Sequence, residues 1–288
     1  MDSKFAPFER ADIAYSKVGD HALVASVLRP KLKVQARSPV LVFWHGGGFV
    51  IGHRLYEPWW SDWSGLNIPS PPSVDRCLNF CRLIEYALSK EAIIVAADYR
   101  LAPEANGTDI LNDMEAFWSW LATTLPSIAH AQAWQAQPDL TRILCVGQST
   151  GGCLAVQSAL LHPELDIKAI VSLYAPLEYD VPTFTVPHPR RILGTMPPAP
   201  RQAEAIIRSY AKKNKGHVRT AGDPAHMWEL LLCVMQQGRV PTFMNAWSDP
   251  RIDIISLLKE VKRIPPIWLI HGEDDTVVRF LVPLSLQF

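Results

Sequence analysis

The sequence lacks an excess of charge of either sign and lacks a cysteine framework. It has 28 basic and 28 acidic residues in 288. A nucleic acid or an acidic membrane surface would require a basic excess, so we expect neither as a partner. Its five cysteines are odd in number, and Cys77 and Cys81 do not have the spacing of redox or zinc motifs. We therefore expect reduced thiols, no metal and no cofactor.

Long apolar runs are also missing. No stretch of about 18 apolar residues suggests a membrane span, and the first residues, Met1 to Phe5, have no apolar leader. We therefore predict a cytoplasmic protein without a membrane span. With 48% hydrophobic and 19% charged residues, the chain has enough apolar side chains for a sizeable core.

Short apolar runs alternate with helix-like stretches. Continuous runs typical of strands that are buried on both faces lie at 39–44, 92–97, 143–146, 169–174 and 266–270. Helical stretches are expected at 109–123, 151–162 and 200–214, and residues 11–17 and 21–28 resemble a hairpin. This order predicts an α/β protein with a mostly parallel sheet that helices cover on both sides.

Two regions interrupt this rhythm. Residues 177–250 have no strong strand signal and several helix-like stretches, which predicts a helical cap inserted over the sheet. Residues 64–82 begin with a turn-rich, uncharged segment that interrupts an expected helix, so we interpret them as an atypical insertion. We expect 1–288 to form a single domain that contains both.

The segment from Gly147 to Gly152 has the G-x-S-x-G pattern of a nucleophile elbow. It follows the apolar run at 143–146 and precedes a helical stretch, which is the setting that an elbow requires. The two flanking glycines allow strand and helix to approach closely. Ser149 is the candidate nucleophile, and a merely structural glycine-rich turn is the alternative.

A second glycine-rich segment, His45-Gly46-Gly47-Gly48, follows the apolar run at 39–44. Backbone N–H groups without side chains nearby can face a ligand. The amides of Gly47 and Gly48, with that of Thr150, would form an oxyanion hole that stabilises a tetrahedral intermediate. We expect His45 itself to hold the loop rather than to carry protons.

A third segment, Asp98-Tyr99-Arg100-Leu101-Ala102-Pro103-Glu104, completes a recognisable set. HGGGF, DYRLAPE and the elbow occur in this order in the hormone-sensitive-lipase-like branch of the α/β-hydrolases, which the chain resembles over roughly residues 20–278. The resemblance implies an α/β-hydrolase fold and a serine esterase. We expect this third segment to be structural, with an ion pair between Asp98 and Arg100.

By the same resemblance, the segment from His271 to Val278 matches the family's HGxxDxxV segment and implies that Asp275 is the catalytic acid. Asp274 is the first alternative and Asp249 a weaker one. A carboxylate after a strand can instead cap a turn. His271 precedes the acid and is expected to be structural.

The family's histidine follows its acid in chain order, and no histidine follows Asp275 here. We therefore expect the family's C-terminal strand and helix to be missing and catalysis to be impaired. His188 and His226, in the predicted cap, are the candidates for a substitute base. The elbow also departs from the family pattern, with Gln148 and Thr150 where aspartate and alanine are more common.

These observations predict a hydrolase that acts on carboxylic esters of a small or medium apolar substrate through an acyl-enzyme. Two alternatives stay open. One is a non-catalytic ligand-binding relative, like the plant gibberellin receptors that resemble this family. The other is a lyase or cyclase of secondary metabolism, because this fold hosts many chemistries. A small-molecule ester is the expected partner, and no oligomeric state is predicted.

Overall fold

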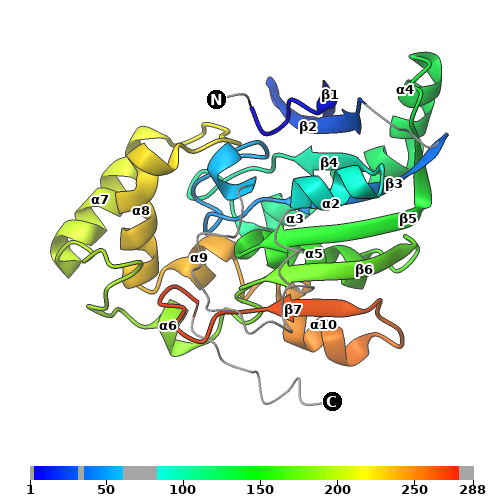
Figure 1. Ribbon diagram of the computed structural model, residues 1–288. Helices are drawn as coiled ribbons and strands as arrows, with labels where there is room; N and C mark the ends of the chain where they lie inside the picture. Colours follow the sequence, from blue (N-terminus) through cyan, green and yellow to red (C-terminus); the bar gives the residue numbers. More distant parts are fainter. Residues whose placement is uncertain (1–2, 32–35, 61–82, 279–288) are drawn as a thin grey trace, which may run out of the picture.

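One mixed sheet organises the molecule (Figure 1). The computed structural model describes residues 3–31, 36–60 and 83–278. In this part of the chain the strands follow the order β1-β2-β4-β3-β5-β6-β7 across the sheet. Their bounds are β1 Phe8–Val18, β2 His21–Pro30, β3 Arg37–Trp44, β4 Ile93–Ala97, β5 Gln137–Gln148, β6 Ile167–Leu173 and β7 Ile267–Ile270.

The sheet is parallel except at one edge. β1 pairs with β2 and β2 with β4 in antiparallel fashion, whereas β4, β3, β5, β6 and β7 run parallel to their neighbours. The prediction of a mostly parallel sheet is therefore confirmed, and the expected hairpin is formed by β1 and β2. β5 begins at Gln137, several residues before the apolar run that predicted it, because a polar stretch pairs with the start of β3.

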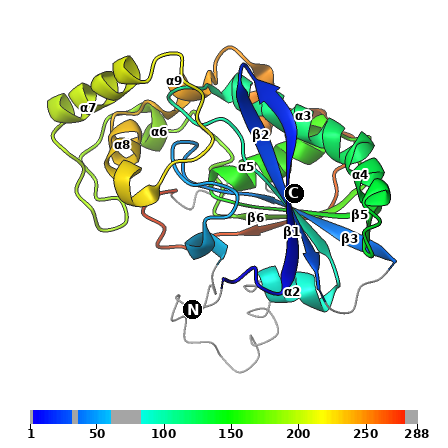
Figure 2. The same cartoon turned by 90° about the horizontal axis from the view of Figure 1, so that it is seen from above.

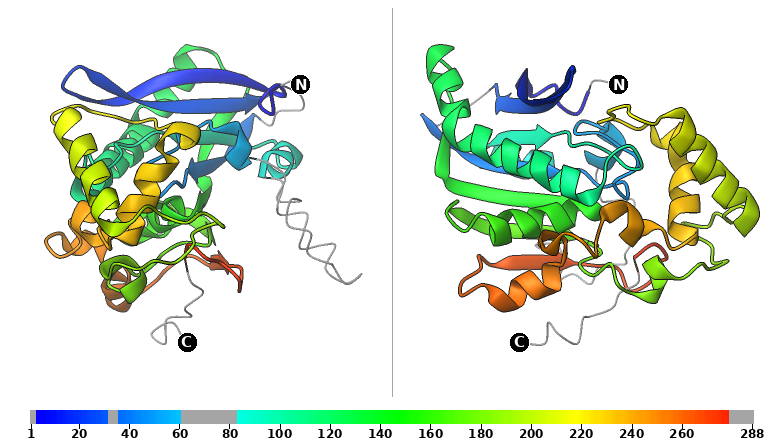
Figure 3. Two further views of the ribbon diagram at one scale, coloured as in Figure 1. Left: turned by 90° about the vertical axis from the view of Figure 1, so that its left-hand side faces the viewer. Right: turned by 180° about the vertical axis from the view of Figure 1, so that it is seen from behind.

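Helices cover both faces of the sheet (Figures 2 and 3). Alternate residues of the central strand β3 point to opposite faces of the sheet. Val40 and Val42 pack with α3 and α5, and Leu41 and Phe43 pack on the side of α2. The helices around the sheet are α2 Leu83–Ser89, α3 Gly107–Thr123, α4 Leu125–Ala131, α5 Thr150–Leu161 and α10 Ile254–Glu260, with the short 3-10 helices η1 Glu57–Trp60 and η4 Pro250–Ile252. This arrangement is the doubly covered sheet that the alternation of elements predicts.

A group of helices lies beside the loops that follow β3 (Figure 1). It consists of α6 Pro182–Thr185, α7 Pro200–Lys213, α8 Pro224–Gln236 and α9 Val240–Met244, and the structure describes no strand within 177–250. Proline at the first position of α6, α7 and α8 fits their start, where a missing N–H costs nothing. The division into one domain with a cap stays a prediction, and residues 64–82 and 279–288 lie outside the described residues.

No helix in the described ranges combines the length and the apolar character needed to cross a membrane.

Candidate active site

Ser149 lies in a strained turn between β5 and α5. Its backbone has φ 51° and ψ −127°, a conformation that non-glycine residues rarely adopt and that concentrates at functional sites. Its N–H donates to the carbonyl of Leu173 at 2.7 Å, and its carbonyl accepts from Gly152 at 2.8 Å. A Cβ on Gly147 would lie 2.0 Å from the Gly151 carbonyl oxygen. The elbow geometry therefore requires glycine at this flanking position.

The glycine loop after β3 packs directly against the elbow. A Cβ on Gly46 would lie 3.1 Å from the Cβ of Ser149, and Gly47 and Gly48 have φ of 106° and 62°. The turn closes through the Gly47 carbonyl, which accepts from the amides of Val50 and Ile51. Residues with Cβ atoms would be strained at both left-handed positions.

The amides expected to form the oxyanion hole are available for a ligand. Those of Gly47, Gly48 and Thr150 donate no hydrogen bond to any other described residue, and all three residues line the same pocket as Ser149. Three amides that face a pocket beside a serine are suited to bind a developing negative charge.

The segment from Asp98 to Glu104 is structural, but the expected pairing of Asp98 with Arg100 is wrong. Asp98 instead forms an ion pair with Arg54, whose backbone N–H also donates to it at 2.8 Å. Arg100 turns toward α3 and binds Asp113 and Asp109. Asp98 thus pairs with a residue much earlier in the chain, whereas Arg100 pairs with the helix that follows it.

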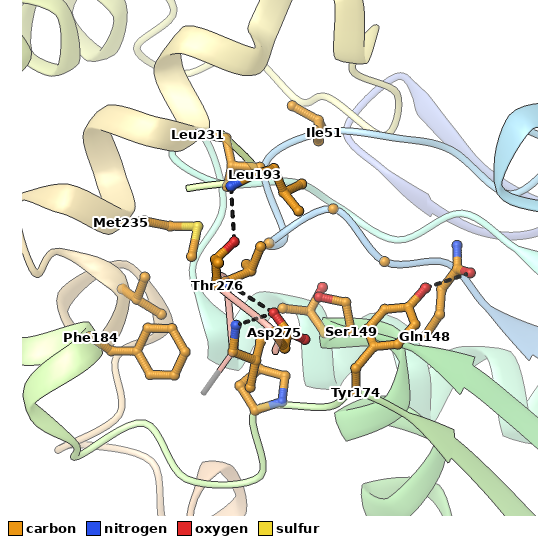
Figure 4. Close-up of a pocket in the computed structure, with 18 of the residues that line it drawn as sticks. Ile51, Gln148, Ser149, Tyr174, Phe184, Leu193, Leu231, Met235, Asp275 and Thr276 are labelled. Carbon is orange, nitrogen blue, oxygen red and sulfur yellow. Dashed lines mark hydrogen bonds between the residues drawn. The ribbon is translucent and has the colours of Figure 1, made fainter. Parts of the chain in front are cut away.

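Asp275 lies in the same pocket, held by its own turn (Figure 4). One carboxylate oxygen accepts from the amides of Val277 and Val278 at 2.8 and 3.0 Å. The other lies 3.3 Å from Nε2 of His271, and that nitrogen also lies 2.7 Å from the Val278 carbonyl oxygen. The carboxylate is thus fixed beside the nucleophile, and His271 contributes to holding its loop.

The alternative acids differ in position. Asp274 also lines the pocket, from its exposed rim. Asp249 is outside it, where hydrogen bonds from Arg251 lower the pKa of its carboxyl to about 2. The described lining includes neither His188 nor His226; His226 is exposed and lies 2.5 Å from Asp223.

The pocket has a volume of about 660 Å³, within the range of small-molecule sites. Its walls are mainly apolar. The loops and the 3-10 helix η1 beside the sheet contribute Ile51, Trp59, Pro176 and Val277. The segment 177–250 contributes Phe184, Leu193, Trp228, Leu231, Met235 and Val240. No lysine, arginine or histidine occurs among the described lining residues. Such walls suit an uncharged ligand with a large apolar part.

Sequence reasoning missed two polar residues of this pocket. Gln148, noted only as a departure from the family pattern, is 4% exposed and lines the pocket beside Ser149. Tyr174 follows β6 and donates a hydrogen bond from its hydroxyl to Oε1 of Gln148 at 3.4 Å (Figure 4). For Gln148, its place next to Ser149 in the elbow motif could have indicated that it lies near the pocket.

Nothing in the described chain resembles a metal centre, because no group of three or more histidine, cysteine, aspartate or glutamate side chains is placed to hold an ion.

His45 is fully buried and supports the glycine loop. Its Nδ1 donates to the Gly46 carbonyl at 2.8 Å, and its ring stacks on Tyr99 at 4.3 Å. Burial lowers the pKa of His45 to about 3, because the charged form would lose its hydration. The imidazole is therefore neutral at physiological pH and does not line the pocket.

His45 should make the protein acid-sensitive. Below its unfolded-state pKa near 6.5 the unfolded chain gains a proton that the folded chain excludes, so stability falls as pH falls from about 6.5 toward 3. From pH 7.5 to 5 this one group should cost about 2 kcal/mol. Burial also lowers the pKa of His53. The difference in unfolding free energy between wild type and His45→Asn therefore separates the contribution of His45 from that of His53. Urea unfolding at each pH measures both curves, and parallel curves would contradict the prediction.

Comparisons with known proteins agree with this geometry. A family model described as alpha/beta hydrolase fold matches residues 72–280. The chain is 62% identical over 282 residues to a probable carboxylesterase, M8, of Phoma sp., covering 97% of this chain and 82% of that protein. It is 66% identical over 188 residues to a probable carboxylesterase, clz11, of Cochliobolus lunatus, covering 65% of this chain and 86% of that protein.

A solved esterase from Pyrobaculum calidifontis has the same fold, with a TM-score of 0.51 and 20% identity over 91% of this chain and 65% of that one. The family match, the high identity to carboxylesterases and the ordered HGGG, DYRLAPE and elbow motifs all agree. The chain therefore belongs to the alpha/beta hydrolase fold family, in its hormone-sensitive-lipase-like branch, and is a carboxylesterase-like hydrolase.

Proposed function

We propose that this protein binds an uncharged carboxylic ester with a small or medium apolar part, and that Ser149 attacks its carbonyl carbon to form an acyl-enzyme. The observation that carries the proposal is the strained Ser149 beside three amides that have no partner among the described residues, in an apolar pocket. In this role the amides of Gly47, Gly48 and Thr150 stabilise the oxyanion. The ester class also agrees with relatives that are named probable carboxylesterases.

Asp275 has the place of the acid that orients and stabilises a histidine base. The described lining contains no such histidine, so proton removal from Ser149 and from the hydrolytic water lacks an efficient acceptor. Both acylation by an ordinary ester and deacylation should be slow. We therefore expect an impaired hydrolase, whose serine still reacts with strongly activated electrophiles.

Labelling with an alkyl fluorophosphonate tests the nucleophile directly, because fluoride leaves readily and the adduct is not released. The wild type should gain one phosphonyl group, located on Ser149 by peptide mass spectrometry. Ser149→Ala should label at least about 100-fold more slowly. Asp275→Asn should label at about the wild-type rate, because the described lining contains no histidine for Asp275 to orient. A folded wild-type protein that stays unlabelled through prolonged incubation would overturn the proposal.

A second function is favoured by the same lining. A pocket with an oxyanion site but no described histidine is suited to hold a carbonyl ligand without turning it over. Calorimetric binding of an apolar ester that is recovered intact, from a protein whose Ser149 is not labelled, would support this ligand-binding function over the hydrolase.

A further inference from the structure

Gln148 is a buried polar side chain in an apolar pocket. It is 4% exposed, immediately precedes the candidate nucleophile Ser149 and lines the cavity with it. Their Cα atoms are about 3.8 Å apart, and because both residues line one cavity, a single ligand can contact both. Figure 4 shows its amide at the end of the pocket opposite the apolar side chains of Phe184 and Met235.

The amide of Gln148 is only half satisfied. Oε1 accepts from the Tyr174 hydroxyl at 3.4 Å, whereas Nε2 donates to no described residue. Nε2 also keeps accessible surface, unlike Thr150 Oγ1 and the Tyr179 hydroxyl, which are sealed in the protein without partners. An acceptor on the ligand would satisfy this donor, because Gln148 lines the cavity and a donor left unpaired is unfavourable.

Tyr174 is held in place by a strained backbone. Its φ is 40°, a left-handed conformation that is unfavourable for a bulky residue, and its N–H donates to the Ile270 carbonyl at 2.6 Å. Strain of this kind persists where the surroundings over-determine it, mostly at functional sites. In Tyr174 the strained backbone belongs to the residue whose hydroxyl donates to Oε1 of Gln148 and so orients that amide. Neither side chain has a part in the attack by Ser149.

We propose that Gln148 and Tyr174 form a specificity subsite for an oxygen acceptor, a hydroxyl or carbonyl oxygen, a few bonds from the carbonyl that Ser149 attacks. The inference rests on the proposed function and narrows its substrate class. The preferred ligands are uncharged esters whose apolar chain carries a hydroxyl or oxo group near the ester. Plain alkanoate esters are bound less well because they leave Nε2 unpaired.

Binding of two matched ketones tests this subsite without requiring turnover. 2-Dodecanone and each enantiomer of 4-hydroxy-2-dodecanone share chain length and carbonyl and differ by one oxygen. Isothermal titration calorimetry with wild-type protein should give about fivefold tighter binding for at least one hydroxyketone enantiomer, the gain of a single neutral hydrogen bond. Equal or weaker binding of both enantiomers would overturn the proposal.

Variants separate recognition from mere structural support. Gln148→Leu should still bind 2-dodecanone but lose the preference for the hydroxyketone, and Tyr174→Phe should reduce that preference by freeing the amide to rotate. Met235→Leu, a matched change in the apolar wall, should alter both affinities together and keep their ratio. If Gln148→Leu does not fold, the loss of the hydroxyketone preference in Tyr174→Phe is the test of the subsite.

A preference that survives in every folded variant would contradict the subsite. Labelling of Ser149 is measured separately. An unreactive serine would contradict the proposed function, whereas the ketone titrations would still test the binding preference.

Discussion

Replacing Gly151 with alanine is expected to lower the free energy of unfolding by about 3 kcal/mol or more. On solvent-exposed helices the same change usually stabilises by up to about 1 kcal/mol, because alanine is the better helix former. The expected result is therefore opposite in sign to the helix propensity of the two residues. Its cause is the contact between α5 and the end of β3.

A Cβ at Gly151 would lie 2.2 Å from the Trp44 carbonyl oxygen and 2.4 Å from that of His45. Both are backbone atoms, so no side-chain rotation can relieve the clash. Trp44 is fully buried in the core, and interiors are packed too densely to absorb a shift of this size. The whole helix would have to move away from the strand and take the elbow with it.

Thermal and urea unfolding measure this prediction. A loss of 3 kcal/mol corresponds to a fall in Tm of roughly 6–12 °C for a chain of this size. Gly272→Ala is the matched control: a Cβ there would meet no atom within 4 Å, and its stability should stay within about 0.5 kcal/mol of wild type. Equal stability of the two variants would mean that α5 can slide away from β3 at little cost.

Local sequence signals identified much of this architecture in advance. Apolar runs such as 39–44 and 92–97 form strands that are buried on both faces. A strand can be apolar at every position only where both of its faces are covered. The glycine motifs predicted which backbone amides lie together, since a missing Cβ is required wherever these loops approach each other. Ser149, Gly47, Gly48 and Asp275 all line one pocket, and their roles stay predictions.

Long-range pairing was not predictable in the same way. Asp98 and Arg100 are close in sequence, yet their partners are Arg54 and Asp113, and only the fold brings these together. The apolar wall of the pocket that includes Leu231 and Met235 depends equally on how α8 packs. Short helices such as α9 carry too few residues for a periodic signal.

One buried ion pair of this long-range kind contributes to the link between the helices α7 and α8 and the sheet loops. Arg219, between α7 and α8, donates to both carboxylate oxygens of Glu104 at 2.9 and 3.0 Å. Its Nη1 donates to the carbonyl of Val50 at 2.7 Å, and Nη2 also donates to the carbonyl of Ala102 at 2.6 Å. Tyr210 of α7 adds a hydrogen bond to Glu104 at 2.8 Å. The side chains of the ion pair are only 15% and 3% exposed.

Arg219→Met is expected to destabilise the protein by about 3–5 kcal/mol, because it leaves the Glu104 carboxylate buried without its partner. Labelling of Ser149 by the fluorophosphonate should also slow. The lost bonds to Val50 and Ala102 release the loop that follows the oxyanion glycines, so their amides are held less firmly. Urea unfolding and labelling rates measure the two effects independently.

Two comparisons test whether the pair itself is responsible. Arg208→Met removes an exposed salt bridge of α7, where Arg208 is 75% exposed and pairs with Glu204 at 3.2 Å, and should cost less than about 1 kcal/mol. Adding Glu104→Gln to Arg219→Met removes the unpaired charge and should recover part of the loss, with a coupling energy of about 1–3 kcal/mol. Strictly additive losses would assign the effect to packing of the arginine stem instead. A cost for Arg219→Met as small as that of Arg208→Met would mean that α7 and α8 are held by apolar contacts, such as that of Leu231 with Gly48, and not by this pair.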